Sequence, residues 1–205
     1  MKSKAIMASL ICLVACQSPT SVFQKTTSSI VKIEVETPMG MGSGSGVVVD
    51  TNIIVTNAHV VGDASHLRIL DNIGNEYTWH MAYVYHKLDL AFLVMEKPMS
   101  LPVMELDLYA PKIGDKVYTI GCPLGMKNVL SDGLFNGVRC DGDLCFTLYS
   151  APISPGSSGG ALLSKEGKLL GITCASFRNS QGMNLAVPAY MVGTMLRRVK
   201  EMEKL

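Results

Sequence analysis

The residues best suited to covalent chemistry lie in a glycine-rich run at positions 155–160, PGSSGG. Such runs are common in ordinary turns, but acyl transfer gives this one a second interpretation. A nucleophilic serine needs its own N–H and that of the glycine two residues earlier to converge on one substrate oxygen, and glycines permit the unusual backbone. A hydroxyl is also a weak nucleophile at neutral pH, so the serine needs a base. Ser158 is therefore a candidate nucleophile whose base must come from elsewhere in the chain.

Four histidines could supply that base: His59, His66, His80 and His86. His66 and His80 lie in alternating apolar and polar stretches, where a histidine is an ordinary surface or half-buried strand residue. His59 instead comes just after a strongly apolar strand at 53–56. Asp89 begins another apolar run, 90–94, where a carboxylate is unusual unless it has a partner. His59 and Asp89 are therefore the candidates for the base and its carboxylate.

These residues lie in motifs that occur in the order found in trypsin-like serine proteases: TNAHVV at 56–61, DLA at 89–91, GCPLG at 121–125 and GSSGGALL at 156–163. The chain looks most like the HtrA (Deg) branch of that family, from about residue 29 to residue 188. The order His, Asp, Ser is that of chymotrypsin-type enzymes and differs from the orders of subtilisins and α/β-hydrolases. The resemblance implies a serine endopeptidase that acts on polypeptides and needs no cofactor or metal ion.

The resemblance also implies a role for each residue of the site. Ser158 attacks the scissile carbonyl, His59 takes its proton and later protonates the leaving amine, and Asp89 holds the imidazole in one tautomer. The backbone N–H groups of Gly156 and Ser158 form the oxyanion hole, and Ser157 supports the turn that presents them. Family members more usually have Asn or Asp where Ser157 stands, a departure that leaves the nucleophile unchanged.

The same resemblance places the specificity pocket. Its base falls on Pro152 or Ile153, and its walls comprise Cys174, Ala175, Ser176, Met183 and Asn184. Because none of these residues is acidic, we do not expect a preference for Arg or Lys. The apolar members favour a small to medium aliphatic P1 residue. Selectivity should be broad, since one methylene group is worth only about 1–3 kcal/mol in such a pocket.

Other functions remain open on the same fold or site. A catalytically silent trypsin-fold binding module on the cell surface is the main alternative, although such proteins usually lose a triad member and this chain has all three residue types. An esterase would share acyl transfer to water. The glycine-rich segment 40–46 lacks dinucleotide-binding spacing and precedes a strand, so we reject a phosphate loop. A net charge of +1 gives no electrostatic reason to expect nucleic acid as a partner.

The first 15 residues predict export. Lys2 and Lys4 precede an apolar run at 5–15, which is too short to span a bilayer core of about 30 Å and fits a signal peptide. Residues 13–16, LVAC, resemble the bacterial lipobox, in which Cys16 is acylated; an ordinary cleavage site is the alternative. Gln17 at the next position implies outer-membrane sorting in a Gram-negative cell. We therefore predict a cell-envelope protein with an N-terminal lipid anchor in the membrane, or otherwise a periplasmic or secreted protein.

Two cysteines flank an Asp-Gly turn that predicts a hairpin, Cys140 and Cys145. In an oxidising compartment they could form a disulfide or remain two free thiols, because the local geometry decides. Their spacing lacks the second ligand pair that a zinc site needs.

Composition and periodicity predict the architecture. The 205 residues are 48% hydrophobic and 17% charged, which is too apolar for a disordered chain. Closely spaced strand-like runs, for example 29–36, 53–56, 90–95 and 116–121, indicate an all-β protein. The resemblance implies two six-stranded antiparallel β-barrels with the site in the cleft between them. An apolar stripe after Pro188 predicts a C-terminal α-helix at 188–205.

The predicted organisation is a signal peptide at 1–15, a flexible tether at 16–29 and a protease domain at 30–190. The N-terminal barrel covers about 30–103 and the C-terminal barrel about 104–187. HtrA proteins usually carry a PDZ module after the protease, and too few residues follow Pro188 for one. We therefore expect a stand-alone protease without PDZ-driven activation.

Overall fold

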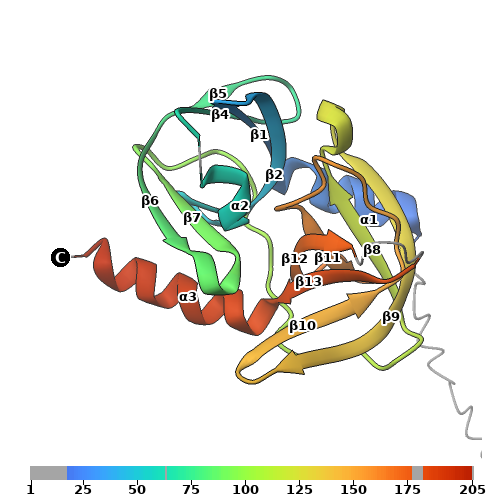
Figure 1. The fold of residues 1–205 in the computed structure, drawn as a ribbon. Helices are drawn as coiled ribbons and strands as arrows, with labels where there is room; N and C mark the ends of the chain where they lie inside the picture. Colours follow the sequence, from blue (N-terminus) through green and yellow to red (C-terminus); the bar gives the residue numbers. More distant parts are fainter. Residues whose placement is uncertain (1–17, 63, 177–181, 205) are drawn as a thin grey trace, which may run out of the picture.

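A computed structural model of the chain describes residues 18–62, 64–176 and 182–204. The signal peptide and the lipidation candidate Cys16 lie outside the described residues. Among the helices that are described, none is long and apolar enough to cross a membrane. The chain forms two β-sheets that pack side by side, with a helix at each end (Figure 1).

The N-terminal half is a seven-stranded antiparallel sheet with the order β5-β4-β1-β2-β3-β7-β6. Its strands are β1 (Ile30–Thr37), β2 (Gly40–Asp50), β3 (Ile53–Thr56), β4 (His66–Leu70), β5 (Glu76–Tyr77), β6 (Trp79–Tyr85) and β7 (Leu90–Met95). The sheet forms a half-barrel and not a closed barrel, because its edge strands β5 and β6 do not pair with each other. Strand β5 has only two residues and pairs with β4. The N-terminal half therefore differs from the expected closed six-stranded barrel.

The C-terminal half is a closed barrel with the order β10-β13-β12-β11-β8-β9. Its strands are β8 (Lys116–Gly121), β9 (Val129–Asp141), β10 (Leu144–Tyr149), β11 (Ala161–Ser164), β12 (Leu169–Ser176) and β13 (Asn184–Pro188). The predicted all-β class with a six-stranded C-terminal barrel and a C-terminal helix is confirmed.

The two halves share one hydrophobic core. Buried residues such as Val47 and Phe92 from the N-terminal sheet pack in the same cluster as Ile120 and Leu163 from the barrel. Helix α3 (Ala189–Met202) starts at the end of β13, runs beneath the N-terminal half (Figure 1) and adds its apolar face to that cluster. The cluster therefore fixes the two sheets against each other, which matters because the predicted triad is divided between them.

The prediction of a flexible tether at 16–29 is wrong for the part that the structure describes, residues 18–29. Helix α1 (Pro19–Thr26) and a 3-10 turn, η1 (Thr27–Ser29), occupy it. Ser18 caps the helix by accepting a hydrogen bond from the Ser21 N–H at 3.2 Å, and Val22 is fully buried in the shared core. The segment is polar in composition, but a short helix needs only one buried contact face to be stabilised by tertiary packing.

Asp71 closes the turn between β4 and β5. Its carboxylate accepts hydrogen bonds from the N–H groups of Ile73, Gly74 and Asn75, from the Asn75 side chain and from the Tyr77 hydroxyl, at 2.8–3.1 Å. Burial by itself would raise the pKa of this carboxyl, but the hydrogen bonds from Asn75, Ile73 and Tyr77 outweigh it and lower the pKa. The turn is therefore held by a charged carboxylate.

The β9–β10 hairpin carries the disulfide that the sequence left undecided. Cys140 and Cys145 face each other across the two strands and are joined by a disulfide bond. Gly142 adopts a positive φ of 58° in the intervening turn, as the Asp-Gly signal predicts. By contrast, Cys122 is a buried free thiol, and burial raises its pKa.

Candidate active site

His59 and Asp89 meet at one edge of the N-terminal sheet. His59 lies on the short helix α2 (Ala58–Val61), which follows β3, and Asp89 lies between the 3-10 turn η2 (His86–Leu88) and β7. Because β3 and β7 are hydrogen-bonded neighbours, these two positions lie side by side. The His59 Nδ1 atom is 2.9 Å from Asp89 Oδ2, and the His59 backbone N–H donates to Asp89 Oδ1 at 3.1 Å. The carboxylate thus fixes the ring and selects the tautomer with a proton on Nδ1, which leaves Nε2 to act as a base.

Asp89 adopts an uncommon backbone conformation at this point. Its φ of 52° and ψ of 43° are left-handed, a conformation that aspartate tolerates better than most residues. The fully buried Asn57 holds it there by donating from Nδ2 to the Asp89 carbonyl at 2.9 Å. The strain is therefore maintained by a contact from the segment that leads to His59, as is common where backbone strain serves a site.

The predicted nucleophile lies on a tight turn before β11. The Ser157 N–H donates to the Ser154 carbonyl at 2.9 Å, and the Gly160 N–H donates to the Ser157 carbonyl at 3.0 Å. Gly156 has a φ of 94°, and a Cβ atom added there would lie 2.8 Å from the Cys122 carbonyl oxygen. Only glycine fits this position, because both the backbone angle and the neighbouring backbone exclude a side chain.

Two backbone N–H groups of the turn are available to a substrate. In the described part of the chain, neither the Gly156 N–H nor the Ser158 N–H donates a hydrogen bond. The Pro155 carbonyl accepts from the Leu124 N–H at 2.8 Å, and the trans peptide directs the Gly156 N–H the opposite way. The N–H of Ser157 is used inside the turn, so this residue supports the turn and is not a third donor. Two unused donors on one turn are what the predicted oxyanion hole requires.

The Ser158 hydroxyl donates to the Cys174 carbonyl of β12 at 3.3 Å. No hydrogen bond joins Ser158 to His59 within the described residues. Catalytic hydrogen bonds are often long or poorly aligned before substrate binds, so the missing bond does not argue against Ser158 as the predicted nucleophile. The structure thus brings His59 and Asp89 together directly, and it places Ser158 on a separate turn.

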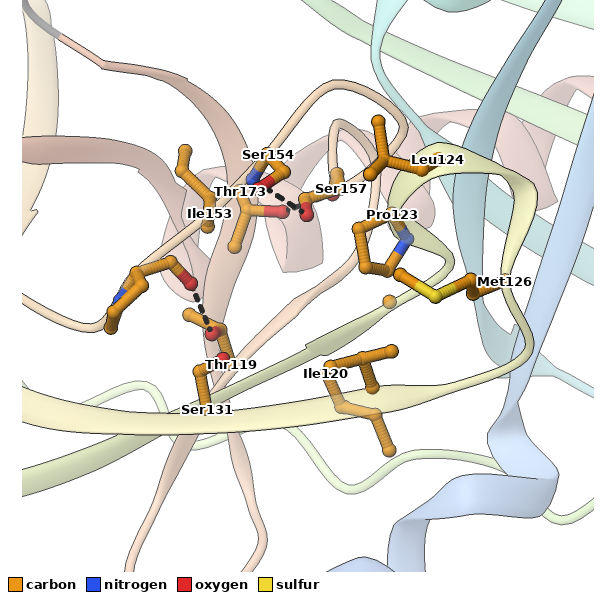
Figure 2. A pocket seen from close by; sticks show the side chains of 13 residues that line it. Thr119, Ile120, Pro123, Leu124, Met126, Ser131, Ile153, Ser154, Ser157 and Thr173 are labelled. Carbon is orange, nitrogen blue, oxygen red and sulfur yellow. Dashed lines mark hydrogen bonds between the residues drawn. The ribbon is translucent and has the colours of Figure 1, made fainter.

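The described residues of the predicted specificity pocket include two that line a cavity. Pro152 and Ile153 line a cavity of about 150 Å³ together with Ser154, Ser157 and residues of β8, as Figure 2 shows. Its lining mixes apolar side chains with hydroxyl groups, and Cys174, Met183 and Asn184 are absent from it.

Residues of the opposite wall of the predicted pocket make contacts within the C-terminal barrel. Asn184 is buried and donates from Nδ2 to the Ala151 carbonyl at 2.7 Å, whereas Met183 is 44% exposed. Ala175 and Ser176 continue β12 and pair with Leu185 and Asn184 of β13. Their side chains lie outside what the structure describes. The amide of Asn184 therefore joins the barrel strands to the segment before the turn.

Among the residues that the structure describes, no group of three or more His, Cys, Asp or Glu side chains is placed to hold a metal ion. The reactive groups that the described site offers are an imidazole–carboxylate pair, a hydroxyl group and two backbone N–H groups.

Comparison with known proteins agrees with this geometry. Residues 44–172, more than half of the chain, match the family described as trypsin-like peptidase domain. The chain belongs to this family.

Relatives of this trypsin-like peptidase domain include HtrA proteins. The chain is 29% identical over 184 residues to Serine protease HTRA1B of Danio rerio, covering 82% of this chain and 38% of the relative. It is 28% identical over 172 residues to the periplasmic serine endoprotease DegP of Escherichia coli K12, covering 78% of this chain and 36% of the relative. The chain therefore spans less than two fifths of the length of these relatives.

Solved structures of similar proteins show the same fold. The HtrA-type protease AlgW with tripeptide superposes with a TM-score of 0.81 at 26% identity, covering 91% of this chain and 64% of that one. The serine endoprotease from Yersinia pestis superposes with a TM-score of 0.77 at 27% identity, covering 88% of this chain and 66% of that one.

Sequence reasoning missed two residues of the trypsin-like site. Asn57, which anchors Asp89, stands inside the TNAHVV motif, where its position two residues before His59 was the available signal. Ser45 lies in the glycine-rich run at 40–46. From the sequence, this run was considered only as a phosphate loop, and that interpretation was rejected. In the structure the Ser45 N–H donates to the Ser158 carbonyl at 2.7 Å. No local pattern predicts such a contact, because it joins the two halves of the fold.

Proposed function

We propose that this chain is a serine endopeptidase with His59, Asp89 and Ser158 as its catalytic triad. The observation that carries the proposal is the pairing of a fixed imidazole–carboxylate couple with a turn that presents a serine and two unused backbone N–H groups. The relatives and solved structures that the chain resembles are named as serine proteases, which supports the same conclusion.

The mechanism follows from the roles that these groups can play. His59 Nε2 takes the proton of the Ser158 hydroxyl as its oxygen attacks the scissile carbonyl, and Asp89 stabilises the imidazolium that forms. The negative oxygen of the tetrahedral intermediate is stabilised by the N–H groups of Gly156 and Ser158. His59 then protonates the leaving amine, and an acyl-enzyme remains. Water activated by the same imidazole hydrolyses the ester and regenerates Ser158.

For specificity, we propose a preference for small to medium aliphatic P1 residues. Pro152 and Ile153 precede the nucleophile turn, and neither can pair with a charged P1 side chain. A peptide library that varies P1 tests the proposal. Cleavage after Val, Ala, Ile or Leu is the expected result, and dominant cleavage after Arg, Lys or Asp would refute it.

For location, we propose export to the cell envelope with lipid attached to Cys16. The basic and apolar segment at 1–15, followed by the LVAC motif, supports this location. The disulfide between Cys140 and Cys145 is compatible with an oxidising compartment. Expression in bacteria fed a radioactive fatty acid should label the wild type and leave Cys16→Ser unlabelled. Equal labelling of both proteins would contradict lipidation at Cys16.

Labelling with a fluorophosphonate probe tests the catalytic proposal directly, because the probe reacts only with an activated serine. We expect the wild type to be labelled and to cleave casein, and Ser158→Ala to do neither while remaining folded by circular dichroism. Replacing Ser157 by Ala is the matched control, since this neighbouring serine should not be the site of labelling. A wild type that is neither labelled nor active would favour a catalytically silent binding module.

A further inference from the structure

We propose that Ser45 is a positioning residue that holds the nucleophile turn in register with the strand leading to His59. The inference rests on the proposed function, because it assigns a role within the same site. Ser45 lies on β2 of the N-terminal sheet and is fully buried. It is separated by more than a hundred positions from the turn that it contacts.

Both the side chain and the backbone of Ser45 bind the nucleophile turn. Ser45 Oγ donates to the Gly156 carbonyl at 2.8 Å and accepts from the Cys122 N–H at 2.8 Å. The Ser45 N–H donates to the Ser158 carbonyl at 2.7 Å. A single hydroxyl that donates to one backbone group and accepts from another, here the half-buried Gly156 carbonyl and the buried Cys122 N–H, has little freedom to rotate. The two hydrogen bonds of the Ser45 hydroxyl therefore fix both the distance and the orientation of the Gly156 carbonyl relative to β2.

Ser45 is also bonded to the strand that carries the base. The Thr56 Oγ1 atom donates to the Ser45 carbonyl at 2.7 Å, and Thr56 ends β3 three residues before His59. Ser45 therefore has one hydrogen bond to the strand that leads to the base, two to the nucleophile turn and one to Cys122. Gly159 of the nucleophile turn packs closely against Ser45 and Thr56. A Cβ atom added to Gly159 would lie 2.0 Å from the Ser45 carbonyl oxygen and 2.3 Å from Thr56 Oγ1.

These contacts matter most for the orientation of Gly156. Its backbone is intrinsically permissive, since glycine lacks the Cβ atom that restricts other residues. The peptide before it is held by the bond from the Leu124 N–H to the Pro155 carbonyl. The peptide after it is held at its carbonyl by Ser45 Oγ and at its N–H by the Ser154 carbonyl. Removing the Ser45 hydroxyl takes away one of these two bonds and loosens the residue that presents an oxyanion N–H. It also leaves the buried Cys122 N–H without its acceptor.

The consequence should appear in the transition state more than in substrate binding. Oxyanion donors act on charge that develops only during the reaction, so their misplacement lowers kcat and leaves KM nearly unchanged. A shift of about 1 Å in a catalytic group can cost roughly a hundredfold in rate. For Ser45→Ala we expect kcat to fall about 10- to 100-fold, with KM changed less than about threefold.

A peptide boronate inhibitor separates this role from a general loss of stability. The boronate forms a tetrahedral adduct with the catalytic serine and places a negative oxygen in the oxyanion hole, so its affinity should fall by about the same factor as kcat. Ser164→Ala is the matched control. Ser164 is also a buried serine that accepts two backbone N–H groups, from Glu166 and Lys168, but it lies at the far end of β11 from the turn. It should lower the melting temperature and leave kcat and boronate affinity unchanged.

Thr56→Val provides a second variant if Ser45→Ala does not fold. It keeps the shape of the side chain and removes only the bond to the Ser45 carbonyl, so it should lower kcat in the same selective manner by a smaller factor. A folded Ser45→Ala or Thr56→Val protein with wild-type kcat and boronate affinity would overturn the role of Ser45. If the wild type itself is not labelled at Ser158 by a fluorophosphonate, the proposed function fails and the role of Ser45 falls with it.

Discussion

The substitution Gly159→Ala tests the close packing of the nucleophile turn against the N-terminal sheet. Gly159 has a φ of 84°, and an added Cβ atom would lie 2.0 Å from the Ser45 carbonyl oxygen. The left-handed conformation costs alanine about 1–2 kcal/mol. The steric overlap adds about 1–3 kcal/mol, because the atom it meets belongs to the backbone and cannot rotate away. We therefore expect the free energy of unfolding to fall by about 2–5 kcal/mol.

Gly114→Ala isolates the two contributions. Gly114 has a similar φ of 91°, but a Cβ atom added there would meet nothing within 4 Å. This variant should pay only the conformational cost of about 1–2 kcal/mol. Urea unfolding followed by circular dichroism gives both free energies. The expected melting temperatures fall by roughly 2–8 °C for Gly114→Ala and roughly 4–20 °C for Gly159→Ala, at about 2–4 °C per kcal/mol.

The comparison has a clear refuting result. If the two variants lose the same free energy of unfolding within about 0.5 kcal/mol, the backbone of Ser45 does not press on Gly159. The packing of the turn against β2 would then be wrong. A Gly159→Ala protein that also keeps full activity would remove the physical basis for joining the base strand to the nucleophile turn through this contact.

Three further predictions concern the base, an acidic turn and the hairpin. Asp89→Asn should lower kcat by about 10⁴-fold, because with its oxygen on the His59 backbone N–H the amide presents an NH2 donor to Nδ1 and holds the ring in the wrong tautomer; a loss below tenfold on a peptide substrate would argue against this role. The lowered pKa of Asp71 means that its contribution to stability is full above the unfolded pKa of about 4 and is lost as the pH falls below it. Melting temperature should therefore drop between about pH 5 and pH 3, less steeply in Asp71→Asn, and identical pH profiles would contradict the assignment. Replacing both Cys140 and Cys145 by Ser should lower the free energy of unfolding by only about 2 kcal/mol, because the closed loop is short; urea unfolding with and without reductant measures the difference.

Several features of this protein could be predicted from the sequence because they are local. The strand at 116–121 was predicted with the bounds that β8 has, since turn residues bracket an apolar run. The motifs around His59, Asp89 and Ser158 identified the family, because each combines a reactive side chain with the glycine or apolar residues that its surroundings require. The C-terminal helix was predicted from its apolar stripe, and α3 begins one residue after Pro188.

Other predictions failed or stayed open where one distant contact decides the outcome. The segment around Val22 resembles a linker in composition, yet Val22 is buried in the shared core and Phe23 packs against that core, which stabilises the segment as a helix. The N-terminal sheet would close into a barrel only if its edge strands β5 and β6 paired with each other. Strand β5, with two residues, is too short to pair with both β4 and β6. The specificity pocket stays a prediction, because the side chains of Ala175 and Ser176 lie outside what the structure describes, and Asn184 is seen only to donate to the Ala151 carbonyl.

The identities of the reacting groups are written in the linear order of residues, because an imidazole, a carboxylate and a hydroxyl carry their chemistry wherever they stand. Their alignment is a property of the folded chain alone. Ser45 contacts a turn more than a hundred positions away through its hydroxyl and its backbone N–H, and both bonds go to backbone carbonyls, which every residue possesses. No pattern of side chains in the sequence therefore predicts the contact. Only the packing of two sheets around a common core brings those atoms within hydrogen-bonding distance.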